Sequence, residues 1–169
     1  MSVANAYEDP RPHAVRERYL ALFGGSDLPV RVAAIAEDLL GLHVEERPGL
    51  AMSGVLLPAE RRVILNADEV PARRRFTLAH ELGHWVCQVQ AGHRAPLYCR
   101  VEDLAMAADR TLEREANVFA AELLMPEPAV RAAWSETLDV ETCAMRFDVS
   151  PSAMQWRLYS FDLVEERPA

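Results

Sequence analysis

Residues 71–90 restrict the fold of this chain more than any other segment, because they combine an amphipathic helical pattern with chemically reactive side chains. Their apolar residues fall on one side of a helix at about 100° per residue: Leu78, Ala79, Leu82, Trp85, Val86 and Val89. His80, Glu81 and His84 fall on the other side, in a His-Glu-x-x-His run that also contains Gly83. The pattern predicts a helix with one face in the core and a chemical site on the other.

The spacing of the two histidines suits a metal ion, because two imidazole nitrogens one helical turn apart can both reach a tetrahedral zinc at about 2.0–2.1 Å. Glu81 lies at the edge of the same face, where it can take a proton from a water activated by the ion. We therefore expect one zinc per chain, held by His80 and His84 with Glu81 as general base, and manganese as a substitute in assays. The alternative is a chance motif with two ordinary surface histidines. Gly83 argues against this, since a glycine there lets another backbone come close.

The third ligand of such a site is expected on the next strong helix, residues 111–125. Glu113 shares one face of this helix with alanines, whereas Glu115 and Glu122 fall on the opposite, solvent-like side. Small neighbours allow another helix to approach closely, and a carboxylate buried there needs a cation. We therefore expect Glu113 as the third metal ligand, with Glu115 as the reserve candidate. Asn117, one turn after Glu113, is placed to hydrogen-bond a metal ligand from outside.

Two stretches together resemble the ImmA/IrrE family of metallopeptidases: Phe76-Thr-Leu-Ala-His-Glu-Leu-Gly-His84 and Leu112-Glu-Arg-Glu-Ala-Asn-Val-Phe-Ala-Ala-Glu-Leu-Leu-Met-Pro126. The likeness covers roughly residues 30–163. It implies a gluzincin-like site with two histidines and a downstream glutamate as ligands, which map onto His80, His84 and Glu113, with Glu81 as the base. It also implies a cytoplasmic endopeptidase that cleaves a DNA-binding repressor in stress-response or mobile-element circuits.

Three short aliphatic segments precede the motif helix, and proline-containing and charged turns separate them. They predict a small antiparallel three-stranded sheet over residues 42–47, 53–57 and 62–66. Two further helices are predicted upstream, over residues 7–22 and 30–40. Together with the resemblance, this predicts an α+β fold in which the small sheet packs with a zincin-type helical core.

Residues 138–147 and 151–161 predict two helices joined by a tight turn, similar to a helix-turn-helix unit. We therefore divide the chain into a metallopeptidase domain, residues 1–128, and a C-terminal helical, helix-turn-helix-like extension, residues 129–169. The second helix of the unit offers only Arg157 as a cation, whereas a recognition helix brings several to the phosphates. Direct nucleic-acid binding is therefore not expected, and a structural or substrate-docking role is favoured.

Charge and hydropathy narrow the partners and the location of the protein. There are 26 acidic and 18 basic residues, and the formal net charge of −8 disfavours nonspecific binding to polyanions. No apolar run approaches the roughly 20 residues of a membrane-spanning helix. The N-terminal segment has no apolar signal core, and three cysteines are too few and too scattered for a disulfide framework. These features predict a cytoplasmic protein without a membrane partner.

Peptide hydrolysis also needs a donor to the developing oxyanion. The loop predicted over residues 91–108 follows the motif helix and is placed to cover the cleft. It contains His93 and Tyr98, and the C-terminal helices contain Arg157 and Tyr159. The sequence does not choose among these four donors.

Two functions from different classes fit these features. The first is a zinc endopeptidase that cleaves a helix-turn-helix repressor, bound extended along the edge of the strand at residues 62–66 or 53–57. The second is a non-proteolytic metal-binding module that regulates or binds a partner in a two-component system of the repressor/anti-repressor or toxin–antitoxin kind. Glu81 favours the peptidase, because a structural zinc site has no use for a base.

Overall fold

The computed structural model describes residues 11–99 and 110–169, and its fold is α+β, as predicted. Its helices are α1 (Pro12–Phe23), α2 (Val32–Ala34), α3 (Pro71–His84), α4 (Arg110–Leu124), α5 (Glu127–Thr137), α6 (Val140–Phe147) and α7 (Pro151–Ser160). Shorter turns are the π-helical η2 (Ile35–Leu39) and η4 (Trp85–Val89) and the 3-10 turn η3 (Pro58–Glu60). The predicted helices are all present where the chain is described; residues 7–10 of the first one lie outside the described part.

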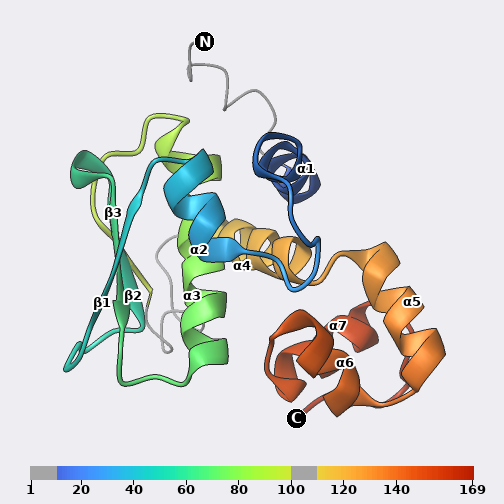
Figure 1. Cartoon of the computed structure of the whole chain (residues 1–169). Coiled ribbons are helices and arrows are strands. Elements are labelled where there is room, and N and C mark those ends of the chain that lie inside the picture. The colour runs from blue at the N-terminus through green and yellow to red at the C-terminus, as the bar shows by residue number, and fades with distance from the viewer. Residues whose placement is uncertain (1–10, 100–109) are drawn as a thin grey trace.

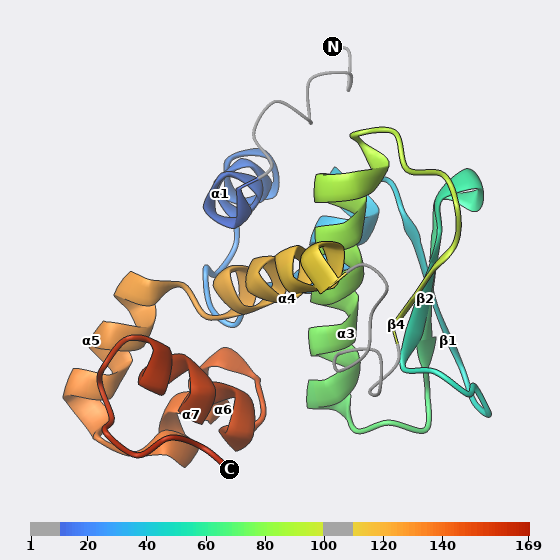
Figure 2. The same ribbon diagram turned by 180° about the vertical axis from the view of Figure 1, so that it is seen from behind.

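The helices are layered on one face of the sheet (Figure 1). Helix α3 packs on that face, and η2 contacts the strand β1 (His43–Arg47) at the edge of the sheet. Helix α4 crosses α3, and α1 packs against α4 (Figure 2). Helices α5, α6 and α7 gather beyond the C-terminal end of α4, on the side away from the sheet. The motif helix α3 therefore lies between the sheet and α4, where both can supply groups to one site.

The sheet has four strands in the order β1-β3-β2-β4: β1 (His43–Arg47), β2 (Gly54–Leu57), β3 (Arg62–Asn66) and β4 (Leu97–Cys99). Strand β1 runs parallel to β3, with His43 opposite Arg62, while β2 is antiparallel to both β3 and β4. The prediction of three antiparallel strands is therefore wrong in strand number and in one pairing. Composition explains the order: β3 buries Val63, Ile64 and Leu65 and belongs inside the sheet, whereas the charged β1 suits an edge.

This order also overturns the predicted peptide-binding edges. The strands at residues 53–57 and 62–66 are each paired on both sides, so neither offers an open edge. Among the described residues, the outer strands are β1 and β4. Strand β4 falls in the segment predicted as a loop, because three residues are too few to show a strand pattern in the sequence.

Helices α3 and α4 touch backbone to backbone at Gly83. A Cβ added there would lie 2.9 Å from the Cα and 3.0 Å from the carbonyl oxygen of Ala116, closer than a side chain tolerates. The expectation that Gly83 lets another backbone approach is therefore confirmed. Since Ala116 lies one turn after Glu113, this close crossing sets the start of α4 against the motif face of α3.

The C-terminal region contains the predicted pair of helices joined by a tight turn. Asp139 caps α6 through the amide of Thr142, Ser150 caps α7 through the amide of Ala153, and Asp148 between them adopts a left-handed conformation. Helix α5 was not predicted. The boundary placed after residue 128 falls in its first turn, so the division of the chain into two domains stays a prediction. No helix in the described part of the chain is both long and apolar enough to cross a membrane.

Candidate active site

The structure brings together the side chains of His80, His84 and Glu113 at the crossing of α3 and α4. The two histidine Nε2 atoms lie 3.0 Å apart. They lie 3.1 Å (His80) and 3.0 Å (His84) from the two carboxylate oxygens of Glu113. All three groups can offer one ligand atom within 4.8 Å of the others, and both histidines are buried. Two nitrogens and a carboxylate converging on one point form a donor set that suits a divalent cation.

The outer nitrogen of each imidazole faces an amide oxygen, which fixes the ring orientation. Nδ1 of His80 lies 2.8 Å from Oδ1 of Asn117, the residue expected to contact a ligand from outside. Nδ1 of His84 bonds Oε1 of Gln88, and Nε2 of Gln88 donates to the carbonyl oxygen of Leu112 at 3.0 Å. An Nδ1–H donated to these oxygens leaves both Nε2 lone pairs free for a metal.

No role was predicted for Gln88 from the sequence. Its signal was its position one turn after His84, on the same face as the motif. What the sequence did not show is that Gln88 contacts His84, because a glutamine on a polar helix face is also an ordinary solvent-exposed residue.

Glu81 is fully buried beside the cluster. Neither carboxylate oxygen has a hydrogen-bond partner among the described residues. Burial raises the pKa of Glu81 to about 8, against the opposing charge of His84. It lies close to the sheet at Gly54 of β2, where an added Cβ would lie 3.5 Å from Oε1 of Glu81. A buried, unpartnered carboxylate is costly, and a cation and its water would remove that cost.

The charges of the cluster are arranged for a cation. Burial alone would raise the pKa of Glu113, but hydrogen bonds to His80 and His84 outweigh it and lower the pKa to about 2. Burial would lower the pKa of His84, but the hydrogen bond to Glu113 and the charge of Glu81 outweigh it, so the pKa is raised. The residues present therefore fit a divalent metal, because Glu113 and the nearby carboxylate of Glu81 have only the two imidazoles as counter-charges among the described residues.

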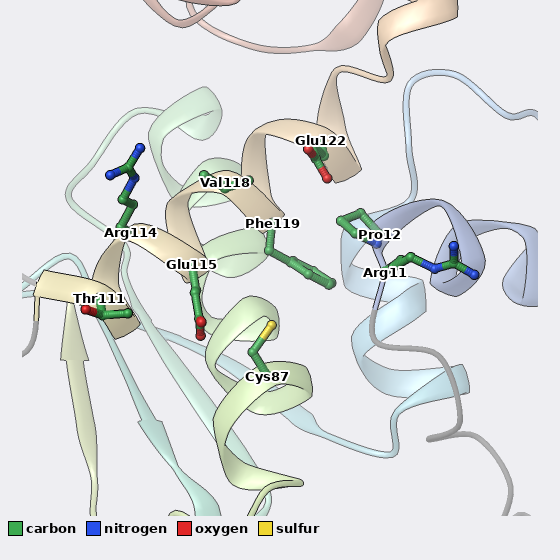
Figure 3. Close-up of a pocket in the computed structure, with 9 residues that line it drawn as sticks. All are labelled: Arg11, Pro12, Cys87, Thr111, Arg114, Glu115, Val118, Phe119 and Glu122. Atoms are coloured by element: carbon green, nitrogen blue, oxygen red, sulfur yellow. The ribbon is translucent and has the colours of Figure 1, made fainter.

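The reserve candidate, Glu115, lies on the other face of α4. It is exposed and lines a separate pocket with Cys87, Val118 and Glu122, as Figure 3 shows. In this arrangement Glu115 points toward Cys87 of η4. The predicted placement of Glu113 and Glu115 on different faces of α4 agrees with their positions in the structure.

The four candidate oxyanion donors are not gathered at the cluster by any described contact. The backbone of His93 bonds the carbonyl oxygen of Gln88, and its buried Nε2 has no partner among the described residues. Arg157 donates through Nε to the carbonyl oxygen of Met125. Tyr159 packs edge-on against Trp156 within α7. The side chain of Tyr98 lies outside the described residues, although its backbone is part of β4.

A small sheet, a helix with a His-Glu-x-x-His motif and a glutamate from a crossing helix together define the class of metallopeptidases. The family model of the IrrE N-terminal-like domain matches residues 37–159, and the chain belongs to this peptidase family. The match spans both the cluster and most of the C-terminal helices.

Two curated relatives carry the name radiation response metalloprotease IrrE. The Deinococcus radiodurans protein is 29% identical over 112 residues, which is 66% of this chain and 32% of that protein. The Deinococcus deserti protein is 31% identical over 112 residues, 66% of this chain and 39% of that protein. The matched region thus spans 32% and 39% of the length of these two relatives.

A solved structure has a similar fold. A Mycobacterium tuberculosis transcriptional regulator superimposes with a TM-score of 0.62 at 19% identity, and the likeness covers 87% of this chain and 45% of that chain. At this identity the likeness concerns the fold alone.

Proposed function

We propose that this protein is a zinc-dependent endopeptidase, with His80, His84 and Glu113 as metal ligands and Glu81 as the general base. The observation that carries the proposal is the buried carboxylate of Glu81, unpartnered among the described residues and adjacent to three converging ligand atoms. A structural metal site needs no such group and is closed by a fourth protein ligand. Membership of a metallopeptidase family supports the same conclusion.

A bound zinc ion would supply Lewis-acid chemistry, lowering the pKa of water and polarising the scissile carbonyl. The chain contributes the rest. Glu81 accepts the proton of the attacking water on a carboxylate oxygen and transfers it to the leaving amine. Asn117 and Gln88 hold the two imidazoles in the orientation and tautomer that a metal requires. Burial of Glu81 and both histidines keeps bulk water away from these transfers.

The substrate is proposed to bind extended along β4. An extended peptide recovers its backbone hydrogen bonds by adding to an open sheet edge. Strand β4 is an outer strand of the described sheet, and its Cys99 lies opposite Gly54, the residue of β2 that lies close to Oε1 of Glu81. This edge is therefore beside the site, whereas the other outer strand, β1, lies across the sheet from it.

The proposed substrate is a DNA-binding helix-turn-helix repressor in the cytoplasm, with manganese able to replace zinc in assays. The resemblance to the ImmA/IrrE family supports this choice of substrate. Backbone pairing at a strand edge gives little sequence selectivity, so selectivity is proposed to come from docking on the C-terminal helices.

Co-expression with the repressor encoded beside the gene tests the proposal. Mass mapping should find one cut in that repressor, absent with Glu81→Gln and present with the matched control Glu115→Gln, which changes an exposed glutamate. A cut that persists with a chelator, or many scattered cuts in unrelated proteins, would count against it. A Glu81→Gln variant with full biological effect would instead favour the non-proteolytic regulatory module.

A further inference from the structure

A groove separates the catalytic helices from α7. It consists of two adjoining cavities of about 470 and 440 Å³ that share Phe76, Ala153 and Trp156 as lining residues. One wall comes from α3 and α4, and the other from the exposed face of α7. Residues of α7, the second helix of the helix-turn-helix-like pair, therefore line this groove.

Two arginines bridge the walls of the groove. Arg75 of α3 donates to the carbonyl oxygen of Asp148, at 3.1 Å, and also pairs with its carboxylate at 3.4 Å. Arg157 of α7 donates through Nε to the carbonyl oxygen of Met125, at the end of α4, at 3.0 Å. These two contacts hold α7 at a fixed distance from α3 and α4 and leave the cavities between the helices open. The groove is therefore preformed, which lowers the cost of binding a ligand in it.

The groove has an apolar floor and a cationic rim. Trp156 is 40% exposed and Val118 48% exposed, which is unusual for large apolar side chains. Among the described lining residues, the ionisable ones are Arg73 and Arg157, and neither cavity is lined by a carboxylate. A third guanidinium, that of Arg167, lies 5.8 Å from the Trp156 ring. The lining of the groove is therefore cationic in a chain with a net charge of −8. The nearby carboxylates, Glu69 beside Arg73 and Glu122 and Glu127 near Arg157, lie outside that lining.

One end of the groove is next to the candidate active site. Asn117 lines the larger cavity and also contacts Nδ1 of His80 at 2.8 Å. Phe76 lines both cavities and lies one helical turn before His80 on α3. A polypeptide seated in the groove is therefore within reach of the site and touches a residue that orients a metal ligand.

We propose that this groove is a docking subsite for the substrate, and that it takes a segment in which large apolar side chains stand next to aspartate or glutamate. The apolar side chains would pack on Trp156 and Phe76. The carboxylates would pair with Arg73, whose present partner, Glu69, is 3.9 Å away, and with the terminal nitrogens of Arg157. Those nitrogens have no protein acceptor among the described residues, since Arg157 bonds Met125 through Nε alone. The inference rests on the proposed function for the identity of the occupant, and on the groove itself for its chemistry.

Binding is tested without cleavage, on the full-length Glu81→Gln variant. The probe is the capped peptide Ac-Leu-Phe-Asp-Asp-NH2, followed by the NMR signal of the Trp156 indole N–H, which is assigned as the signal that disappears in Trp156→Phe. The peptide should shift this signal and bind about tenfold more tightly than the analogue with two lysines in place of the aspartates. Trp156→Ala should weaken binding about tenfold. Met145→Ala, which removes an exposed apolar side chain outside the groove, should leave binding unchanged.

An unmoved indole signal at millimolar peptide, equal binding of the lysine analogue, or unchanged affinity of Trp156→Ala would each overturn the inference. A second arm uses the repressor cleavage assay, where Trp156→Ala should raise KM about tenfold with kcat preserved. A loss confined to kcat would contradict docking. If no metal-dependent cut occurs with the wild-type protein, the proposed function fails, while the NMR experiment still decides whether the groove binds such peptides.

Discussion

Glu113 of α4 lies at the histidine cluster, whereas Glu115 and Glu122 are exposed on another face, and this difference predicts which substitutions remove the metal. The purified protein should hold about one zinc per chain. His80→Ala, His84→Ala and Glu113→Ala should each deplete it after dialysis, because each removes one of the three converging ligand atoms. Glu115→Ala, on the exposed face, should retain it. Metal analysis that found zinc kept by Glu113→Ala and lost by Glu115→Ala would show that the exposed glutamate is the ligand.

The amides behind the histidines should matter almost as much as the ligands. Gln88→Ala should weaken zinc binding by roughly 10–100-fold, because the His84 ring loses the oxygen that holds its tautomer and orientation. Competition with a chelating dye measures the affinity, and Glu122→Ala, an exposed site on α4, is the control. Equal affinities for Gln88→Ala and the wild type would mean that the hydrogen bond does not support the metal site.

The buried Glu81 predicts how the stability of the metal-free protein depends on pH. Because burial raises its folded-state pKa to about 8, the folded protein favours its protonated form. Its contribution to stability is full below the ordinary carboxyl pKa and is lost as the pH rises towards 8. Glu113, with its pKa lowered to about 2, loses its contribution only in acid, as the pH falls through that value.

With chelator present, Glu81→Gln should therefore lose less stability than the wild type between about pH 5 and pH 8. The difference should be on the order of a few kcal/mol, since one pKa unit corresponds to about 1.4 kcal/mol. Urea unfolding at both pH values measures it. Equal losses in the two proteins would mean that Glu81 is not buried as a costly carboxylate.

Among the elements, the crossing of α3 and α4 decides whether the site forms. Gly83→Ala should destabilise the protein by roughly 1–3 kcal/mol and weaken metal binding, because the added methyl group meets the backbone of Ala116. This exceeds the gain of about 0.5–1 kcal/mol that alanine brings to a helix interior. Thermal unfolding and zinc titration measure both effects, with Ala132→Val on the exposed face of α5 as control. A more stable variant would show that the crossing adapts without cost.

The helices and strands differ in how well the sequence predicts them. Helix α3 was predictable because its apolar period and its chemical motif extend over many residues, and Glu113 because its face of α4 is lined with alanines. The pairing of β1 with β3 was missed, since alternation within a strand says nothing about its neighbours. Strand β4 and helix α5 were also missed, the first because it has only three residues. The role of Gln88 was missed although its spacing places it on the motif face, because a glutamine there equally fits an ordinary polar surface.

At the scale of the whole molecule, the core is continuous across the predicted domain boundary. Leu124 and Met125 at the end of α4 belong to the same buried cluster as Met154 and Leu158 of α7. The protein should therefore unfold in a single cooperative transition, because neither part buries its apolar residues without the other. Calorimetry measures this. Two separated transitions would instead support independent domains at residues 1–128 and 129–169.

The requirement of Glu81 for a metal-dependent peptide cut is measured most directly with purified, zinc-loaded protein and the neighbouring repressor. Zinc content and the rate of cleavage are determined on the same samples of wild type and Glu81→Gln. We predict equal zinc content in both, with cleavage by the wild type alone and its loss on adding chelator. Cleavage by Glu81→Gln at the wild-type rate, or by a zinc-free sample, would contradict the assignment of this site as the centre of a metallopeptidase.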